Sequence, residues 1–171
     1  MNAAHEQEVI AYHESGHAVV HHFYGHQVEE VATGKDTARC VFAGGLEKDV
    51  GSATLKGLIE NEFYLQHLIV CCAGKASMDR WYGYKAKGEQ NWRGSDDRNQ
   101  AFTCALKLSD GDTEAAELLV KWGERRAEVM VERTWPQVRK LAFALLEHGK
   151  LSGHQVRDLL GGQDRNGEQR Q

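Results

Sequence analysis

The sequence lacks an excess of basic residues, a long apolar run and a secretory leader. Its formal net charge is −4 at pH 7, which argues against a dedicated nucleic-acid binder because no basic excess neutralises phosphates. No uninterrupted apolar run approaches the ~20 residues of a membrane-spanning helix. The N-terminal segment MNAAHEQEV has neither the basic flank nor the apolar core of a signal peptide. We therefore expect a soluble, cytoplasmic protein with no membrane span and no nucleic-acid partner.

Paired cysteines are also missing. A zinc ribbon needs thiolates at short C-x-x-C spacings, and none of the four cysteines forms such a pair. Cys71 and Cys72 are adjacent within the apolar run LIVCCAG, where cysteine usually packs as a small core residue. A thiolate metal site is therefore not expected.

The chain has a single proline, Pro136, so helices are rarely interrupted. Its 171 residues, 41% of them hydrophobic, are enough for one globular domain, 1–161, and the polar tail 162–171 should be disordered. The expected class is mainly α, a helical bundle with a small hairpin or short sheet. Apolar periodicity and capping residues predict helices over 5–25, 53–83 with a break near Gly74, 95–110, 113–133, 134–149 and 152–160, and a hairpin within 28–45.

What the sequence does contain is histidine, and the stretch IAYHESGHAVV places His13 and His17 four residues apart. On a helix, residues at this spacing share one face, about 6 Å apart along the axis, so two imidazoles can bind one zinc ion. Glu14 follows the first histidine, where a carboxylate can take a proton from water at the metal. The alternative is a histidine-rich surface helix. The apolar neighbours favour burial, and buried histidines beside a glutamate need a partner such as a metal.

A third ligand is needed, and the nearest histidine does not qualify. His21 lies about 12 Å along the helix axis from His13, too far to share an ion with bonds of about 2 Å. The metzincin pattern would need glycine at Val20 and histidine at Phe23. A downstream glutamate, Glu60 or Glu62, remains an alternative, and Asp97 in RGSDDRNQA is the other candidate.

Three stretches resemble the FtsH-type family of ATP-dependent zinc proteases. AYHESGHAVV is similar to the family's zinc motif, LIVCCAGKAS to an apolar helix that ends in a glycine-rich turn, and ALLEHGKLSGHQVRDLL to its C-terminal segment. A later family helix opens with a glycine-x-serine-asparagine-aspartate run and has alanine four residues on. Gly94, Ser95, Asp96, Asp97 and Ala101 match it. The resemblance covers about residues 9–160 and implies an FtsH-type peptidase fold with Asp97 as the third zinc ligand.

A helix that starts at Ser95 agrees with this assignment. Serine is a good N-cap, and Asp97 would then lie in the first helical turn, where a carboxylate is favoured. The sequence departs from the family in two respects. Met78 and Asp79 stand where the family usually has two acidic residues, and no G-x-x-x-x-G-K-[ST] phosphate loop occurs anywhere in the chain. We therefore expect no ATP site of the family's kind in this chain.

The resulting prediction is a zinc metalloendopeptidase in which His13, His17 and Asp97 bind Zn²⁺ and Glu14 is the general base. The segment from Val28 to Phe42 resembles the family's edge strand beside the site, so the expected substrate is an unfolded or extended polypeptide. The resemblance also implies a separate ATPase and an oligomer as partners, since family members form hexamers. The alternative is a zinc-binding but non-proteolytic adaptor or assembly module, although such a module has no use for Glu14 as a base.

Overall fold

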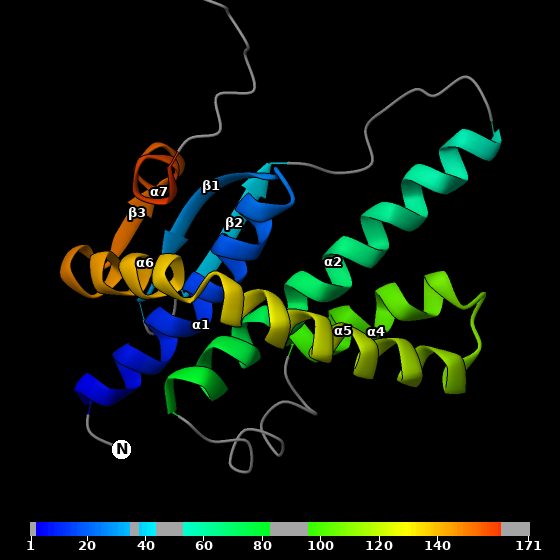
Figure 1. Ribbon diagram of the computed structural model, residues 1–171, viewed down its shortest axis with the longest axis horizontal. Helices are drawn as coiled ribbons and strands as arrows, with labels where there is room; N and C mark the ends of the chain where they lie inside the picture. The colour runs from blue at the N-terminus through cyan, green and yellow to red at the C-terminus, as the bar shows by residue number, and fades with distance from the viewer. Residues whose placement is uncertain (1–2, 35–37, 44–52, 83–95, 162–171) are drawn as a thin grey trace, which may run out of the picture.

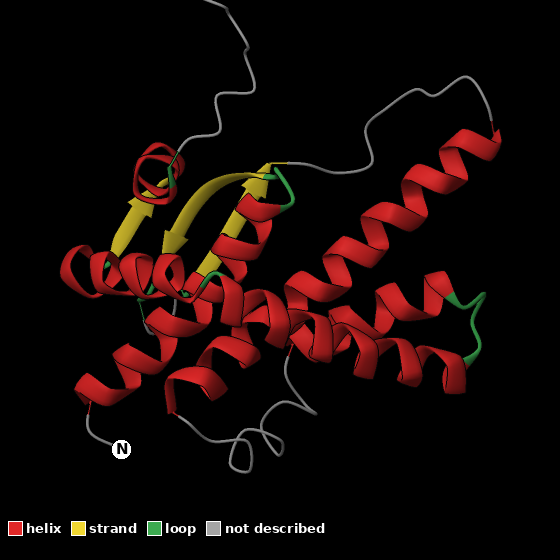
Figure 2. Ribbon diagram, in the orientation of Figure 1, coloured by secondary structure: helices red, strands yellow, loops and turns green. Residues whose placement is uncertain are grey.

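The computed structural model describes residues 3–34, 38–43, 53–82 and 96–161 (Figure 1). In chain order the elements are α1 (Ala3–Phe23), β1 (Gln27–Ala32), β2 (Arg39–Ala43), α2 (Ala53–Tyr82), α4 (Asp96–Leu108), α5 (Thr113–Arg133), α6 (Trp135–His148), β3 (Lys150–Ser152) and α7 (Gly153–Leu160). Most of the described residues are helical, and the strands form one small antiparallel sheet (Figure 2). The expected class is confirmed. The expected N-cap Ser95 and the tail 162–171 lie outside the described residues.

None of the described helices is long and apolar enough to cross a membrane.

Local sequence signals explain where the later helices begin and end. The Asp112 side chain accepts a hydrogen bond from a backbone N–H in the first turn of α5, and Pro136 lies at the start of α6, where its missing N–H costs nothing. Gly149 ends α6 with a φ of 71°, a conformation that glycine adopts without strain. Ser152 and Gln155 form a capping box at the start of α7.

The predicted break near Gly74 is wrong, because α2 runs without interruption from Ala53 to Tyr82. Glycine inside a helix costs about 1 kcal/mol relative to alanine, but α2 packs against α1, α4 and α5. These contacts outweigh the local preference. The segment LIVCCAGKAS therefore lies within a helix and does not end in a turn.

Helix α1 contributes residues to two hydrophobic cores. One core joins it to α2, α4 and α5 and is built around Leu68, Val120 and Val131. The other joins α1 to the sheet, α6 and α7 and is built around Val31 and Leu141. Each fully buried aliphatic side chain of this size contributes about 1.5–3 kcal/mol. Both cores therefore fix the position of the helix that carries the histidine pair.

Aromatic stacking fixes the rotation of α1 about its own axis. Tyr12 stacks on Trp81 of α2, with ring centroids 4.9 Å apart, and on Trp135 of α6, with centroids 5.6 Å apart. Neighbouring residues on a helix point about 100° apart. With Tyr12 held between two tryptophans, His13 faces a different side, toward α2 and α4.

The sheet has the order β2-β1-β3, so β2 is an edge strand. The predicted hairpin is confirmed by the antiparallel pairing of β1 with β2, which contains a bulge between Val28 and Glu30. Strand β3 was not predicted. It has only three residues, and its residue Leu151 pairs with Val31 of β1, far away in the sequence. No local sequence pattern predicts such a pairing.

Candidate metal centre

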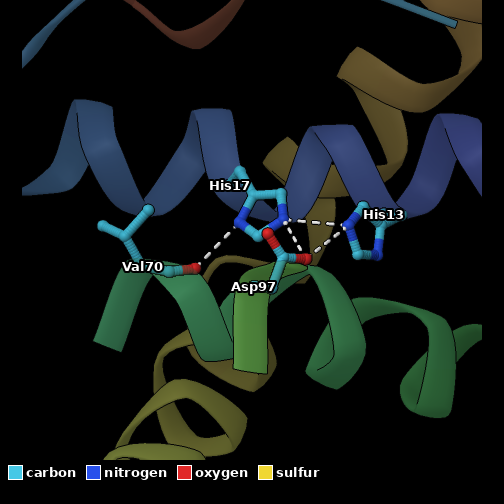
Figure 3. A network of polar contacts seen from close by, with 4 residues as sticks. All are labelled: His13, His17, Val70 and Asp97. Carbon is cyan, nitrogen blue, oxygen red and sulfur yellow. Dashed lines mark hydrogen bonds and ion pairs between the residues drawn. The ribbon is translucent and has the colours of Figure 1, made fainter. Parts of the chain in front are cut away.

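Three side chains from two helices converge between α1, α2 and α4 (Figure 3). His13 and His17 project from one face of α1, and their Nε2 atoms are 3.0 Å apart. Oδ2 of Asp97, in the first turn of α4, lies 2.9 Å from His13 Nε2 and 3.2 Å from His17 Nε2. Residues 80 positions apart in the chain thus present three donor atoms to one point.

The donor set and its spacing fit a metal ion such as zinc. Two imidazole nitrogens and a carboxylate oxygen are typical zinc ligands, and bonds of about 2.0–2.1 Å in tetrahedral geometry place ligand atoms about 3.4 Å apart. The observed separations of 2.9, 3.0 and 3.2 Å need only a slight widening. In the part of the chain that the structure describes, this is the only set of three or more histidine, cysteine, aspartate or glutamate residues whose ligand atoms are spaced closely enough to hold one metal ion.

The orientation of His17 is set by a backbone carbonyl. His17 Nδ1 lies 2.8 Å from the carbonyl oxygen of Val70 on α2 (Figure 3). Because a carbonyl only accepts, Nδ1 carries the proton and a neutral ring has its lone pair on Nε2, toward His13 and Asp97. Metal-binding histidines are generally oriented in this way by a partner at the second nitrogen.

Two glycines allow α1 and α2 to approach closely at the site. A Cβ at Gly74 would lie 2.5 Å from both the His13 and His17 rings, and a Cβ at Gly16 would lie 2.5 Å from the carbonyl oxygen of Ala73. The segment that approaches Gly16 closely is therefore α2. Gly74 provides the space that both imidazoles occupy.

We expect Gly74→Ala to weaken zinc binding at least ~10-fold, a cost similar to the loss of a group that orients metal ligands. The new methyl group would push both rings out of alignment. Gly57→Ala in the same helix is the matched control, because nothing lies within 4 Å of its Cβ. That control should keep zinc affinity and gain up to about 1 kcal/mol of stability. Competition with a chelator measures the zinc affinity, and thermal melting measures the stability. Equal zinc affinity in the two variants would contradict this role of Gly74.

The electrostatics of the cluster favour a positive charge at its centre. Burial alone would lower the pKa of His17, but the hydrogen bond to Asp97 and the Asp97 charge raise it to about 9. Burial would likewise raise the pKa of Asp97, yet contacts with His13 and His17 hold it well below its usual range. Asp97 is therefore ionised at neutral pH. The same field that holds a proton on His17 would hold a metal cation.

Glu14 lies beside the three donor atoms without joining them. Its side chain is 7% exposed, and burial raises the pKa of its carboxyl group, partly offset by the two histidines. A metal cation at the neighbouring residues would lower that pKa again. Among the described residues, none forms a hydrogen bond with the Glu14 carboxylate, so it is available to accept a proton.

The site opens into a cavity of about 430 Å³. Glu14 and the three donor residues lie in its wall together with residues of β2 and α2 and the start of α4. The lining residues other than the four just named are His21, Ala38, Arg39, Cys40, Phe42, His67, Val70, Cys71, Asp96 and Gln100. A ligand in this cavity would therefore contact the candidate metal centre and β2 at the same time.

The other candidate ligands lie apart from the three donor atoms. Asp96 is exposed at the edge of the cavity, and Glu62 accepts a hydrogen bond from Gln66. Neither Glu60 nor Glu62 lines the cavity. His21 lines it but does not belong to the group with metal-site spacing. The structure thus brings Asp97, and neither glutamate, to the histidine pair.

Sequence reasoning missed several residues of the site. The Val70 carbonyl is a backbone group and has no sequence signal, and Gly74 was interpreted as a helix break. His67, Phe42 and Gln100 lie on separate elements, and only tertiary folding brings them into the cavity wall.

No family model matches this chain, and no curated protein matches it. The geometry of the site and the motif itself are therefore the features that point to a function.

Proposed function

We propose that this chain is a zinc-dependent metalloendopeptidase with the FtsH-type peptidase fold, acting on unfolded or extended polypeptides. The observation that carries the proposal is the convergence of His13, His17 and Asp97 with Glu14 buried beside them in an open cavity. A purely structural zinc site is closed by four protein ligands. Three ligands and an adjacent carboxylate are typical of a catalytic site.

His13 Nε2, His17 Nε2 and Asp97 Oδ2 are the atoms that would hold the metal. When bound, zinc supplies Lewis acidity, which polarises a carbonyl and lowers the pKa of water toward ~7. The protein's own contribution is orientation. The Val70 carbonyl fixes the His17 ring, and the charge of Asp97 offsets the cost of a cation in a partly buried position.

Glu14 supplies the acid–base step. Its carboxylate takes a proton from the water that attacks the scissile carbonyl and later passes this proton to the leaving amine. The C–N bond breaks, the water oxygen stays on the new carboxyl group, and Glu14 returns to its carboxylate form. The burial of Glu14 limits the access of bulk water to this transfer.

Strand β2 supports the choice of an extended substrate. It is the edge strand of the sheet, and Arg39, Cys40 and Phe42 of this strand line the cavity. An edge strand offers unpaired backbone N–H and C=O groups to an extended chain. Backbone hydrogen bonds of this kind would hold a substrate beside the candidate metal centre with little dependence on its sequence.

The test is hydrolysis of a permanently unfolded polypeptide by the zinc-loaded chain, compared with a folded protein of similar size and without ATP. We expect the unfolded chain to be cut at least ~10-fold faster, because an extended backbone is available only there. Cleavage that appears only when a separate ATPase is added would keep the peptidase but make it dependent on that partner. Bound zinc with no cleavage under either condition would instead favour an adaptor.

A further inference from the structure

A second group of imidazoles lines the same cavity, beginning one helical turn beyond His17. His21 of α1 and His67 of α2 line the cavity, and Phe42 of β2 lies against both, with ring centroids 4.0 Å from His21 and 5.6 Å from His67. His26 does not line the cavity, and its Nδ1 lies 2.9 Å from His21 Nδ1. The candidate metal centre uses none of these side chains.

A chain of hydrogen bonds determines which nitrogen of His21 carries the proton. Gln66 donates from Nε2 to Glu62, so its Oε1 is the acceptor for His26 Nε2, 2.9 Å away. His26 Nε2 therefore carries a proton, and the Nδ1 of a neutral His26 has a lone pair. His21 Nδ1 must then donate to His26, which leaves Nε2 of His21 as a hydrogen-bond acceptor for the cavity.

The surroundings of His21 keep it neutral, as this assignment requires. Its side chain is 2% exposed. Burial, together with the charges that His26, His17 and His67 would carry, lowers the pKa of His21 to about 2. Burial likewise lowers the pKa values of His26 and His67. A neutral imidazole with Nδ1 protonated presents one lone pair and no charge.

The lone pair on His21 Nε2 is not expected to bind a second metal ion. Among the described residues, the group with metal-site spacing is His13, His17 and Asp97 alone, so His21 has no companion ligands there. A hydrogen-bond donor on a substrate side chain would satisfy this acceptor. The ring of Phe42 lies beside the imidazoles and favours a substrate side chain whose donor group is attached to an aromatic ring.

We propose that the part of the cavity wall formed by His21, His67 and Phe42 is a specificity subsite that binds a substrate side chain with an aromatic body and a neutral donor at its tip, tyrosine above all. The proposal rests on the proposed function, because it places this side chain next to the scissile bond. The tyrosine O–H would donate to His21 Nε2 while its ring packs beside Phe42.

The alternatives fit the subsite less well. Phenylalanine fills the same volume but leaves the buried acceptor of His21 unpaired, and a site built to bind a hydroxyl rejects the analogue that lacks it. Lysine would bring a charge into a place where burial already disfavours charged groups. Serine has a donor but no aromatic body to cover Phe42.

The tautomer can be tested without any peptidase assay. Imidazole ¹⁵N spectra distinguish a protonated nitrogen from one with a lone pair, and we expect Nδ1–H with unprotonated Nε2 for His21 in the zinc-loaded chain. Gln66→Leu removes the acceptor for His26, so the His21 tautomers should become mixed while the cavity wall stays intact. A His21 that is protonated at Nε2 in the wild-type chain would overturn the proposal.

The specificity is tested with peptide pairs that differ only by tyrosine or phenylalanine beside the scissile bond. Wild type should show kcat/KM about tenfold higher for the tyrosine peptide, the scale of one neutral hydrogen bond. His21→Phe should bring this ratio close to one, and Gln66→Leu should lower it. His22→Phe is the matched control, because His22 adjoins His21 but does not line the cavity, and it should keep the wild-type ratio.

Binding of the same peptides to zinc-loaded Glu14→Gln separates this inference from the proposed function. If no peptide is cut by wild type but the tyrosine peptide still binds about tenfold more tightly, the peptidase proposal fails and the subsite stands. If both peptides are cut at equal rates, or the preference survives His21→Phe, the peptidase stands and the subsite is wrong.

Discussion

Replacing Glu14 with glutamine should lower the hydrolysis of an unfolded polypeptide at least ~100-fold, the usual contribution of a general base. Glutamine keeps the size of the side chain but cannot take a proton from water. Glu14 is not among the three atoms that converge as candidate ligands. Zinc content and melting temperature should therefore stay near the wild-type values, and the loss should appear in kcat with little change in KM.

The matched control is Glu29→Gln, an exposed glutamate on β1. It makes the same chemical change away from the cavity and should leave the rate unchanged. If wild type and Glu14→Gln are equally inactive while both bind zinc, Glu14 is not a catalytic base and the adaptor alternative takes the place of the peptidase.

Replacing Asp97 with asparagine should weaken zinc binding at least ~100-fold, the upper end of the cost of losing even an outer-shell partner. The carboxylate oxygen that approaches both histidines at 2.9 and 3.2 Å becomes a neutral amide. The charge that favours a cation is lost with it. Chelator competition, with folding checked by circular dichroism, measures the change.

Asp96→Asn is the control for this change, because the two aspartates are neighbours on one helix. Asp96 is exposed, and its charge acts only through the first helical turn, an effect of at most about 1 kcal/mol on the helix. Zinc affinity should change no more than a few-fold. If Asp96→Asn weakened zinc binding more than Asp97→Asn, the ligand would be Asp96 and the assignment to Asp97 would be wrong.

The sequence predicted those parts of the fold that local chemistry decides. Asp112, Pro136 and Ser152 place the ends of α5, α6 and α7, and these signals can be read within a few residues. The spacing of His13 and His17 likewise follows from one turn of helix. The link to Asp97 came from the family resemblance, since 80 residues separate it from His17 and no local pattern connects them.

The parts that were missed depend on tertiary contacts. Glycine is a residue that often interrupts helices, and Gly74 was therefore predicted as a break. In the folded chain Gly74 lies within α2 and leaves room for the His13 and His17 rings. Strand β3 exists because β1 pairs with it. His21 was considered only as a metal ligand and rejected on distance. Its proposed role as a hydrogen-bond acceptor depends on His26 and Gln66. Only the tertiary fold brings Gln66 of α2 to this histidine pair, so the sequence alone does not show the contact.

The most direct test of the proposed zinc peptidase activity is a titration of metal-free chain with zinc while the cleavage of an unfolded polypeptide is followed. We predict no cleavage without metal, a rate that rises in proportion to added zinc, and a break at one zinc per chain, as expected for one site of three protein ligands. Cleavage that is independent of zinc, or a fully loaded chain that cuts nothing, would contradict the account.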